Sequence, residues 1–201
     1  MSNENHQLPH SPAAERNKSV ILNQLRKFLE TSKEVMEIGH GTGEHALYFA
    51  KELQHLNWYP YDTKDYNWIL AEKIKENKIV NLKNPTPFLV DTNKILPNVD
   101  RKFDSLYCAN VFHIMHAKEV EFLCGELHKF ISDRIILYGP YKFNGDFTSQ
   151  SNFEFDQSLK TRDPLMGIRD VEKVQEWLKE FQLKENIQMP ANNNLLLFTR
   201  V

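Results

Sequence analysis

The sequence is poor in cysteine, and this scarcity restricts both the fold and the compartment. Cys108 and Cys124 are the only two cysteines among 201 residues, and both stand in apolar stretches without the spacing of metal ligands. A disulfide-stabilised fold is therefore not expected. We predict a cytoplasmic protein without a bound metal.

Long hydrophobic runs and an excess of basic residues are lacking as well. The first ten residues are polar, and no apolar stretch approaches the length of a membrane span, so neither a secretion signal nor a membrane anchor is expected. The net charge is −2, and lysines are interleaved with acidic residues, which leaves no broad basic face. Nucleic acids and membranes are not expected as partners, and no sequence signal indicates an oligomeric state.

The remaining composition is typical of one globular domain. Hydrophobic residues make up 41% of the chain and charged residues 26%, and we expect a single domain over residues 1–201. Ser11 followed by Pro12 predicts a helix over residues 12–30 with one buried apolar stripe. An aromatic-rich insertion, expected to form a lid, occupies about residues 139–169.

Short apolar runs alternate with amphipathic segments along most of the chain, which is typical of βα units in a mostly parallel sheet. The expected strands are residues 35–38, 58–61, 87–90, 105–111 and 134–138. The expected helices are residues 44–53, 66–76, 118–130 and 170–181. The tryptophans Trp58, Trp68 and Trp177 are expected to pack in the core or on helix faces.

The last two expected strands, residues 183–188 and 195–199, are joined by so short a loop that they must be antiparallel. The pattern thus predicts an α/β fold with a doubly wound, mostly parallel seven-stranded sheet and a C-terminal antiparallel pair. This is the layout of class I methyltransferases, whereas a plain dinucleotide-binding fold usually lacks the closing pair.

A glycine-rich loop follows the first strand, with Gly39, Gly41 and Gly43 in G-x-G-x-G spacing. The dinucleotide fingerprint places a third small residue at position 44, where this chain has Glu44. Glutamate there would repel a pyrophosphate, but Glu37 and Glu44 would tolerate the ammonium and sulfonium of S-adenosylmethionine. The loop, including Thr42, therefore favours S-adenosylmethionine over NAD as the cofactor.

Three polar residues stand at expected strand ends, where open α/β sheets bind ligands. Asp62 can accept hydrogen bonds from both ribose hydroxyls, and its alternative role is a turn-forming aspartate. Asp91 can bind the adenine amino group. Asn110 can contact the amino-acid end of the cofactor or the methyl-transfer cavity, and for both residues the alternative is a helix cap.

The chain also carries motifs that resemble those of a methyltransferase-like family catalogued as a domain of unknown function. The matching segments are residues 12–18, 37–43, 138–141, 151–156, 162–170 and 189–193. The resemblance implies a class I methyltransferase fold with a cofactor site around the glycine loop, and it implies no particular acceptor. The chain departs from the family at His40, where a small residue is usual, and at residues 131–134, which replace a Pro-Gly-Gly turn.

His113 is the best candidate for a general base, because imidazole titrates near neutrality. Its alternative role is a packed histidine at a strand end, and His116 is a weaker candidate base. Arg16 and Asn17 could fold over the cofactor from the first helix, or they could be solvated.

The candidates for recognition of the acceptor come from the end of the fifth strand, the insertion and the C-terminal loop. They are Tyr138, Tyr141, Asn152, Asp156, Arg162, Asp163, Arg169 and Asn192. The alternative for the charged members is that Arg162 with Asp163, and Arg169 with Asp170, form ion pairs that brace the insertion.

The leading hypothesis from the sequence is an S-adenosylmethionine-dependent methyltransferase with a small-molecule acceptor. A non-catalytic module that binds S-adenosylmethionine or a protein partner through the same fold is the first alternative. An NAD-dependent reductase is the second alternative. Such an enzyme commonly has a tyrosine and a lysine four residues apart on a helix. The nearest such pair here is Tyr138 with Lys142, which is not expected to lie in a helix.

Overall fold

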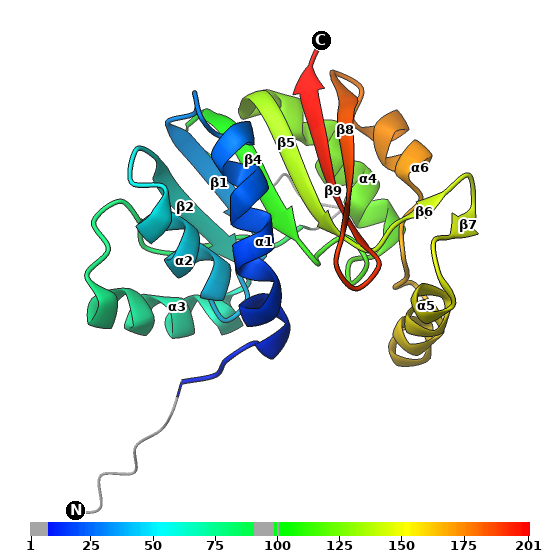
Figure 1. Ribbon diagram of the computed structural model, residues 1–201, viewed down its shortest axis with the longest axis horizontal. Helices are drawn as coiled ribbons and strands as arrows, with labels where there is room; N and C mark the ends of the chain where they lie inside the picture. Colours follow the sequence, from blue (N-terminus) through cyan, green and yellow to red (C-terminus); the bar gives the residue numbers. More distant parts are fainter. Residues whose placement is uncertain (1–7, 91–98, 100) are drawn as a thin grey trace, which may run out of the picture.

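The computed structural model describes residues 8–90, 99 and 101–201, and these residues form a seven-stranded sheet with helices on both faces (Figure 1). The strand order is β3-β2-β1-β4-β5-β9-β8. The strands are β1 Glu34–Ile38, β2 Asn57–Asp62, β3 Thr86–Pro87, β4 Phe103–Ala109, β5 Ile131–Gly139, β8 Phe181–Met189 and β9 Asn193–Arg200. The predicted fold class is confirmed.

In this seven-stranded sheet four neighbouring strand pairs are parallel, and the two pairs that involve β9 are antiparallel. The C-terminal pair was predicted from its short loop, and its strands are longer by one or two residues at each end than the sequence suggested. β3 is shorter than predicted. Pro87 is tolerated because β3 is an edge strand, and the Phe88 amide still donates to the Asp62 carbonyl at 2.7 Å.

The helices are α1 Pro12–Phe28, α2 Glu44–Glu52, α3 Lys64–Asn77, α4 Ala117–Glu126, α5 Gln150–Arg162 and α6 Val171–Trp177, with a 3-10 turn at Leu127–Lys129. The predicted helix over residues 170–181 is too long, because the chain passes into β8 at Phe181. The insertion contains a small hairpin, β6 Lys142–Phe143 with β7 Asp146–Phe147, and then α5. It is thus folded rather than a loop.

The strands alternate between two apolar layers because successive side chains point to opposite faces of the sheet. On β5, Ile135 and Leu137 pack with α4 and α6, whereas Ile136 and Tyr138 pack with α1 and α2. Figure 1 shows α1 and α2 on the near face of the sheet and α4 behind it. Both faces are therefore covered, as a mostly parallel sheet requires.

The N-terminal helix begins as predicted and ends two residues early. Ser11 is its N-cap and accepts a hydrogen bond from the Ala14 amide at 3.3 Å. Ile21, Leu22, Leu25 and Phe28 form the buried stripe. No helix among residues 8–90, 99 and 101–201 is long and apolar enough to cross a membrane.

The tryptophans divide into core and surface. Trp58 is fully buried and packs on Phe49 and Tyr107, and Trp177 packs against the opposite layer. Trp68, on α3, is 54% exposed, so its predicted packing role is at most partial.

These environments predict unequal losses of stability for the same substitution. Trp58→Ala should lower the free energy of unfolding by about 3–5 kcal/mol, because it opens a cavity between α2 and the sheet. Trp68→Ala is the matched control and should cost less than about 1 kcal/mol. Urea denaturation followed by circular dichroism measures both, and equal losses would contradict the packing described.

Candidate functional site

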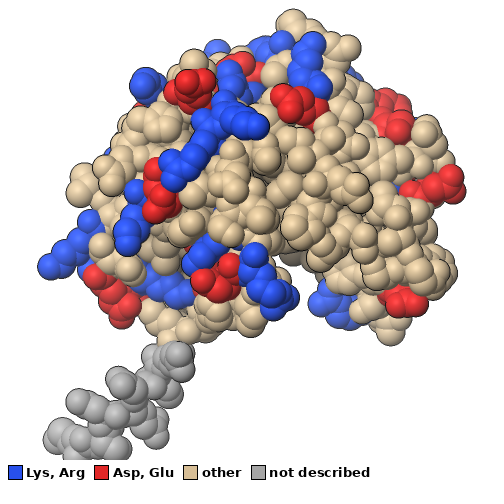
Figure 2. Space-filling model, in the orientation of Figure 1, with Lys and Arg blue, Asp and Glu red and all other residues tan. Residues whose placement is uncertain are grey.

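A cavity of about 1100 Å³ lies at the carboxyl edge of the parallel strands. Its walls come from the glycine loop, the ends of β2, β4 and β5, the start of α1, the start of α5 and the loop before β9. The surface is hollowed between the N-terminal end of α1 and α5, with basic side chains on both sides (Figure 2). Ligands bind in this position in open α/β sheets.

The glycine loop has a backbone that only glycine adopts without strain. Gly39, Gly41 and Gly43 have φ values of 78°, 55° and 89°. A Cβ at Gly43 would lie 2.6 Å from Leu70, and one at Gly39 would collide with Val111. At Gly41 the space is open, with no atom within 4 Å of such a Cβ. The loop therefore leaves room for a ligand beside Gly41.

The carboxylate of Asp62 is joined directly to this loop. Its Oδ2 accepts the Gly41 amide hydrogen at 2.7 Å, and its Oδ1 accepts that of Thr63 at 2.7 Å. Gly41 and Asp62 both line the cavity. The structure thus brings together the bend and the carboxylate, and each carboxylate oxygen keeps a second lone pair for a ligand.

The unusual His40 is accommodated without disturbing the loop. Its side chain is buried, with Nε2 2.8 Å from the Asn67 side-chain oxygen on α3 and Nδ1 2.9 Å from the Gly41 carbonyl. His40 also lines the cavity. A larger residue is tolerated at this position because α3 supplies a partner for it.

Glu37 does not line the cavity. Its Oε2 accepts a hydrogen bond from the Trp58 indole at 2.7 Å within the core. Burial raises the pKa of Glu37 from 4.5 to about 8, so the carboxyl is neutral at pH 7. The structure therefore gives no support to the prediction that Glu37 offers a negative charge to a cofactor.

Glu44 lines the cavity, but its charge is already compensated. Lys73 approaches at 2.8 Å, His10 at 3.2 Å, and the Thr42 hydroxyl donates to the same carboxylate. Burial acts to raise the pKa of Glu44, but the hydrogen bonds from Lys73 and Thr42 and the charge of Lys73 bring it below its usual value. Its attraction for a bound cation is correspondingly weak.

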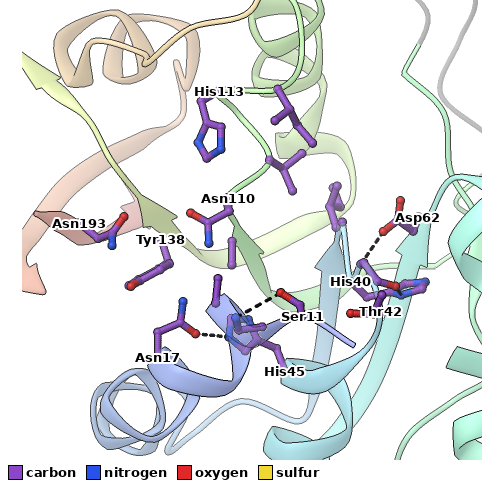
Figure 3. Close-up of a pocket in the computed structure, with 18 of the residues that line it drawn as sticks. Ser11, Asn17, His40, Thr42, His45, Asp62, Asn110, His113, Tyr138 and Asn193 are labelled. Carbon is purple, nitrogen blue, oxygen red and sulfur yellow. Dashed lines mark hydrogen bonds between the residues drawn. The ribbon is translucent and has the colours of Figure 1, made fainter. Parts of the chain in front are cut away.

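Asn110 and His113 face the cavity from beyond β4 (Figure 3). Asn110 has a left-handed backbone with φ of 59°, and its side chain makes no hydrogen bond with the part of the chain that the structure describes. The His113 ring contacts Phe155 edge to face at 5.2 Å. Strained, unpaired polar residues are typical of functional sites. The expected Asp91 lies outside the described residues.

Desolvation, together with the charges of Arg169 and Arg162, lowers the pKa of His113 to about 4. Its imidazole is therefore neutral at pH 7, with a nitrogen lone pair available. The ring is buried and packed, as the alternative role requires, but it has no hydrogen-bond partner among the described residues.

Two of the residues expected to recognise the acceptor border the cavity, namely Tyr138 and Asn152. Asn152 donates to Thr148 Oγ1 and to the Asn192 carbonyl. Arg16 and Asn17 also line the cavity, from α1.

The other six expected acceptor residues do not line the cavity, and five of them are buried or have structural partners instead. Tyr141 is buried in the core. Asp156 accepts the Ile168 amide hydrogen at 2.8 Å and pairs with Lys160, while Asp163 pairs with His116 at 2.9 Å. Arg162 and Asn192 do not line the cavity either, although Asn192 donates to Ser151 Oγ.

Arg169 ties the insertion to the segment after β4. Its guanidinium donates to the carbonyls of Phe112 at 3.0 Å and Met115 at 2.5 Å. The expected bracing of the insertion therefore exists, but its partners are backbone carbonyls and His116. Asp170 accepts the Gly145 amide instead of pairing with Arg169. The adjacent charged residues in the sequence therefore indicated which segment is braced, but they did not indicate which groups Arg169 and Asp163 bind.

Sequence reasoning missed most of the apolar lining. These residues are Tyr66, Phe88, Leu89, Ile114, Met115 and Pro190, together with the polar His45 and Asn193. Leu89, Ile114 and Phe155 are large apolar side chains with substantial exposure. The sequence signal that could have identified lining residues such as Leu89 and Ile114 is their position shortly after predicted strands.

A protein-family model matches residues 8–200, described as a protein of unknown function, DUF938. The chain belongs to the DUF938 family. This agrees with the resemblance seen in the motifs.

Solved structures similar to this DUF938 chain include methyltransferases. The apo form of the S-adenosylmethionine-dependent methyltransferase SibL has a TM-score of 0.72 at 16% identity, over 94% of this chain and 55% of that one. An O-methyltransferase family 2 protein from Planctomyces limnophilus, in complex with apigenin, has a TM-score of 0.75 at 14% identity, over 94% and 58%. This chain thus spans little more than half the length of either.

Magnesium protoporphyrin IX methyltransferase from Synechocystis, with bound S-adenosylhomocysteine, has a TM-score of 0.67 at 14% identity, over 92% of this chain and 82% of that one. At such identities the likeness establishes the fold. The DUF938 chain has the class I, Rossmann-like methyltransferase fold.

The buried carboxyl of Glu37 predicts a pH-dependent stability. Between pH 4.5 and about 8 the folded protein keeps the carboxyl proton of Glu37, while the unfolded chain has lost it. The free energy of unfolding therefore falls as the pH rises, by up to about 1.4 kcal/mol per pH unit. Glu37→Gln should remove this slope, because glutamine mimics the protonated acid and still accepts from Trp58.

Denaturation at pH 5, 6, 7 and 8 measures the effect. Glu185→Gln, at an exposed position on β8, is the matched control and should keep the wild-type slope. An unchanged slope in Glu37→Gln would show that the carboxyl ionises normally.

Proposed function

We propose that this protein is an S-adenosylmethionine-dependent methyltransferase that acts on a small-molecule acceptor. The observation that carries the proposal is the hydrogen bond from the Gly41 amide to Asp62, which sets an open glycine bend and a carboxylate side by side on one cavity wall. A nucleoside with a ribose diol fits such a pair, because the carboxylate accepts from both hydroxyls.

The cavity has space for two molecules. Its volume of about 1100 Å³ exceeds the range of about 300–1000 Å³ usual for a pocket that holds one drug-sized ligand. Beside Asp62, the side chains of Tyr66, Phe88 and Leu89 provide an apolar surface for a base. S-adenosylhomocysteine in one structural relative and apigenin in another support a cofactor and a small acceptor here.

The remaining cofactor contacts are assigned by their place along the sheet edge. Gly39, Gly41 and Thr42 would hold the ribose and the start of the amino-acid chain, with Gly43 keeping α2 in position. Asn110, at the end of the next strand, would meet the amino-acid end, and Arg16 of α1 would face its carboxylate. Asp91 remains a candidate for the adenine amino group.

S-adenosylmethionine supplies, when bound, an electrophilic methyl group on a sulfonium sulfur. The protein contributes by holding the acceptor atom in line with that methyl group and excluding water. The insertion, tied down by Arg169, covers the cavity with Phe155 and the start of α5. His113 would take up a proton on its ring nitrogen where the acceptor atom must lose one.

The cofactor assignment predicts the effect of removing one carboxylate charge. Asp62→Asn should weaken binding of S-adenosylhomocysteine at least tenfold, because it removes an acceptor for a ribose hydroxyl and loosens Gly41. Asp65→Asn, an exposed position on α3, is the matched control and should bind like the wild type.

Calorimetry measures both variants, with NAD titrated in parallel. Tight NAD binding together with no S-adenosylhomocysteine binding at millimolar ligand would end the proposal. Binding of S-adenosylhomocysteine without methyl transfer to any member of a broad acceptor library would favour the non-catalytic module. The reductase has no support, because Tyr138 and Lys142 lie on separate strands.

The state of His113 can be measured before any acceptor is known. We predict that its ring proton resonances titrate with a midpoint of about 4, well below the usual 6.5. The imidazole would then be neutral from pH 6 to 8 and able to accept a proton throughout. Nuclear magnetic resonance with His113→Gln for assignment tests this, and a midpoint near 6.5 would contradict the burial described.

A further inference from the structure

The ammonium group of Lys73, on α3, joins three segments that are far apart in the sequence. It donates to the Thr42 carbonyl at 2.7 Å, to the Pro9 carbonyl at 2.9 Å and to Glu44 Oε1 at 2.8 Å. An ammonium has three hydrogens, so these contacts use all of its donors. Its side chain is only 13% exposed, and Lys73 does not line the cavity. The glycine loop, the start of α2 and the chain before α1 are therefore joined at one atom.

The contact with Thr42 fixes one peptide of the glycine loop. In a trans peptide the C=O and the N–H point in opposite directions. Here the Gly43 amide donates to the His40 carbonyl at 2.9 Å, and the Thr42 carbonyl at the other end of the same peptide accepts from Lys73. Lys73 therefore holds the loop from outside the cavity, in addition to the contact that Asp62 makes with it.

The contact with Pro9 belongs to a segment of the cavity wall, residues 8–17, which we call the strap. The strap residues that line the cavity are Ser11, Ala13, Ala14, Arg16 and Asn17. No residue of the strap is buried, and the buried stripe of α1 begins only at Ile21. The strap thus covers the cavity without being part of the core.

Polar contacts attach the strap to the rest of the protein. Besides the bond from Lys73 to Pro9, His10 Nδ1 lies 3.2 Å from Glu44 Oε1. Asn17 Oδ1 lies 2.6 Å from His45 Nε2, as Figure 3 shows. A segment with few buried apolar contacts opens at a lower free energy than the core. The position of the strap therefore depends largely on these polar contacts.

A stabilising ion pair is the simpler role for Lys73, since Glu44 is buried and its charge requires compensation. That role accounts for only one of the three contacts. His10 and the Thr42 hydroxyl also approach Glu44, so the carboxylate has further partners. The two carbonyl contacts are not required by an ion pair, and they are the ones that join the loop to the strap.

The loop and the strap are held at the same end of the cavity, because both carbonyls lie within hydrogen-bonding distance of one nitrogen. Under the proposed function, the loop holds the ribose and the start of the amino-acid chain, and Arg16 of the strap faces the carboxylate. A ligand that contacts both segments binds better when both are in place. Closing of the strap and binding of the cofactor are then linked, and each favours the other.

We propose that Lys73 is a positioning residue for cofactor binding, which keeps the strap closed against the glycine loop by binding the carbonyls of Pro9 and Thr42. This inference rests on the proposed function for the identity of the ligand. It adds that the affinity for the cofactor depends on a residue that does not touch it.

Lys73→Met tests the proposal, because methionine is unbranched like lysine and has no hydrogen to donate. Calorimetry should show that S-adenosylhomocysteine binds about tenfold more weakly than to the wild type. Lys73→Arg keeps a cation with several donors and should recover most of the affinity. Lys75→Met, which removes an exposed lysine paired with Glu72 on the same helix, is the matched control and should bind like the wild type.

Lys73→Met also leaves Glu44 without its lysine, and a double variant separates this effect. Lys73→Met with Glu44→Gln has no uncompensated charge at this place. Relative to Glu44→Gln alone, the double variant should still lose about tenfold in affinity, because the carbonyl contacts are missing in it. Affinity equal to that of Glu44→Gln would assign the loss to the charge of Glu44 and overturn the proposal.

Hydrogen exchange followed by mass spectrometry measures the strap directly. Without ligand, the peptide that covers residues 8–20 should exchange at least threefold faster in Lys73→Met than in the wild type, while peptides from β4 and β5 should not change. Saturation with S-adenosylhomocysteine should slow this exchange in the wild type. His10→Ala removes a half-exposed side chain, and it should change exchange and affinity in the same directions by smaller factors.

Two further results would overturn the proposal. One is wild-type affinity for S-adenosylhomocysteine in Lys73→Met, and the other is weaker binding without faster exchange of residues 8–20, since Lys73 would then act without the strap. If the wild type does not bind S-adenosylhomocysteine, the proposed function fails by itself. The exchange of the ligand-free proteins then still decides whether Lys73 holds the strap.

Discussion

The hydrogen bond between the Gly41 amide and Asp62 joins the ends of two neighbouring parallel strands, and the cavity depends on it. β1 ends in a bend of left-handed glycines, and β2 ends in a carboxylate that accepts a backbone amide hydrogen of this bend. The hydrogen bond between them holds the Gly41 backbone and the Asp62 side chain in place. The space beside Gly41 is open, and it lies next to this contact.

Charge is distributed around this cavity in a consistent way. Glu37 is kept neutral by burial, Glu44 is paired with Lys73, and His45 and His113 are kept neutral because their charged forms would be desolvated. Arg16 is the lining cation without an ion pair in the described part of the chain. Asp62 remains as a lining carboxylate whose hydrogen-bond partners are backbone amides.

The insertion after β5 combines two functions in one segment. Arg169 and Asp156 bind it to backbone groups and hold its shape, while Phe155 and Asn152 on α5 turn towards the cavity. A segment anchored in this way covers the ligand-binding space without forming part of the sheet. Its two short strands and its helix lie outside the seven-stranded sheet.

The sequence determined the fold and half of the site. Alternating apolar runs, the G-x-G-x-G bend and the short final loop specified a parallel sheet with an antiparallel pair, because these signals are local in the chain. Asp62 and Asn110 were found for the same reason, since residues after parallel strands meet at one edge. Tertiary structure decided the rest, because burial and pairing depend on contacts between distant segments. Only the packed chain shows that Glu37 turns into the core towards Trp58, that Arg169 binds carbonyls, and that His45 lies against the Asn17 side chain.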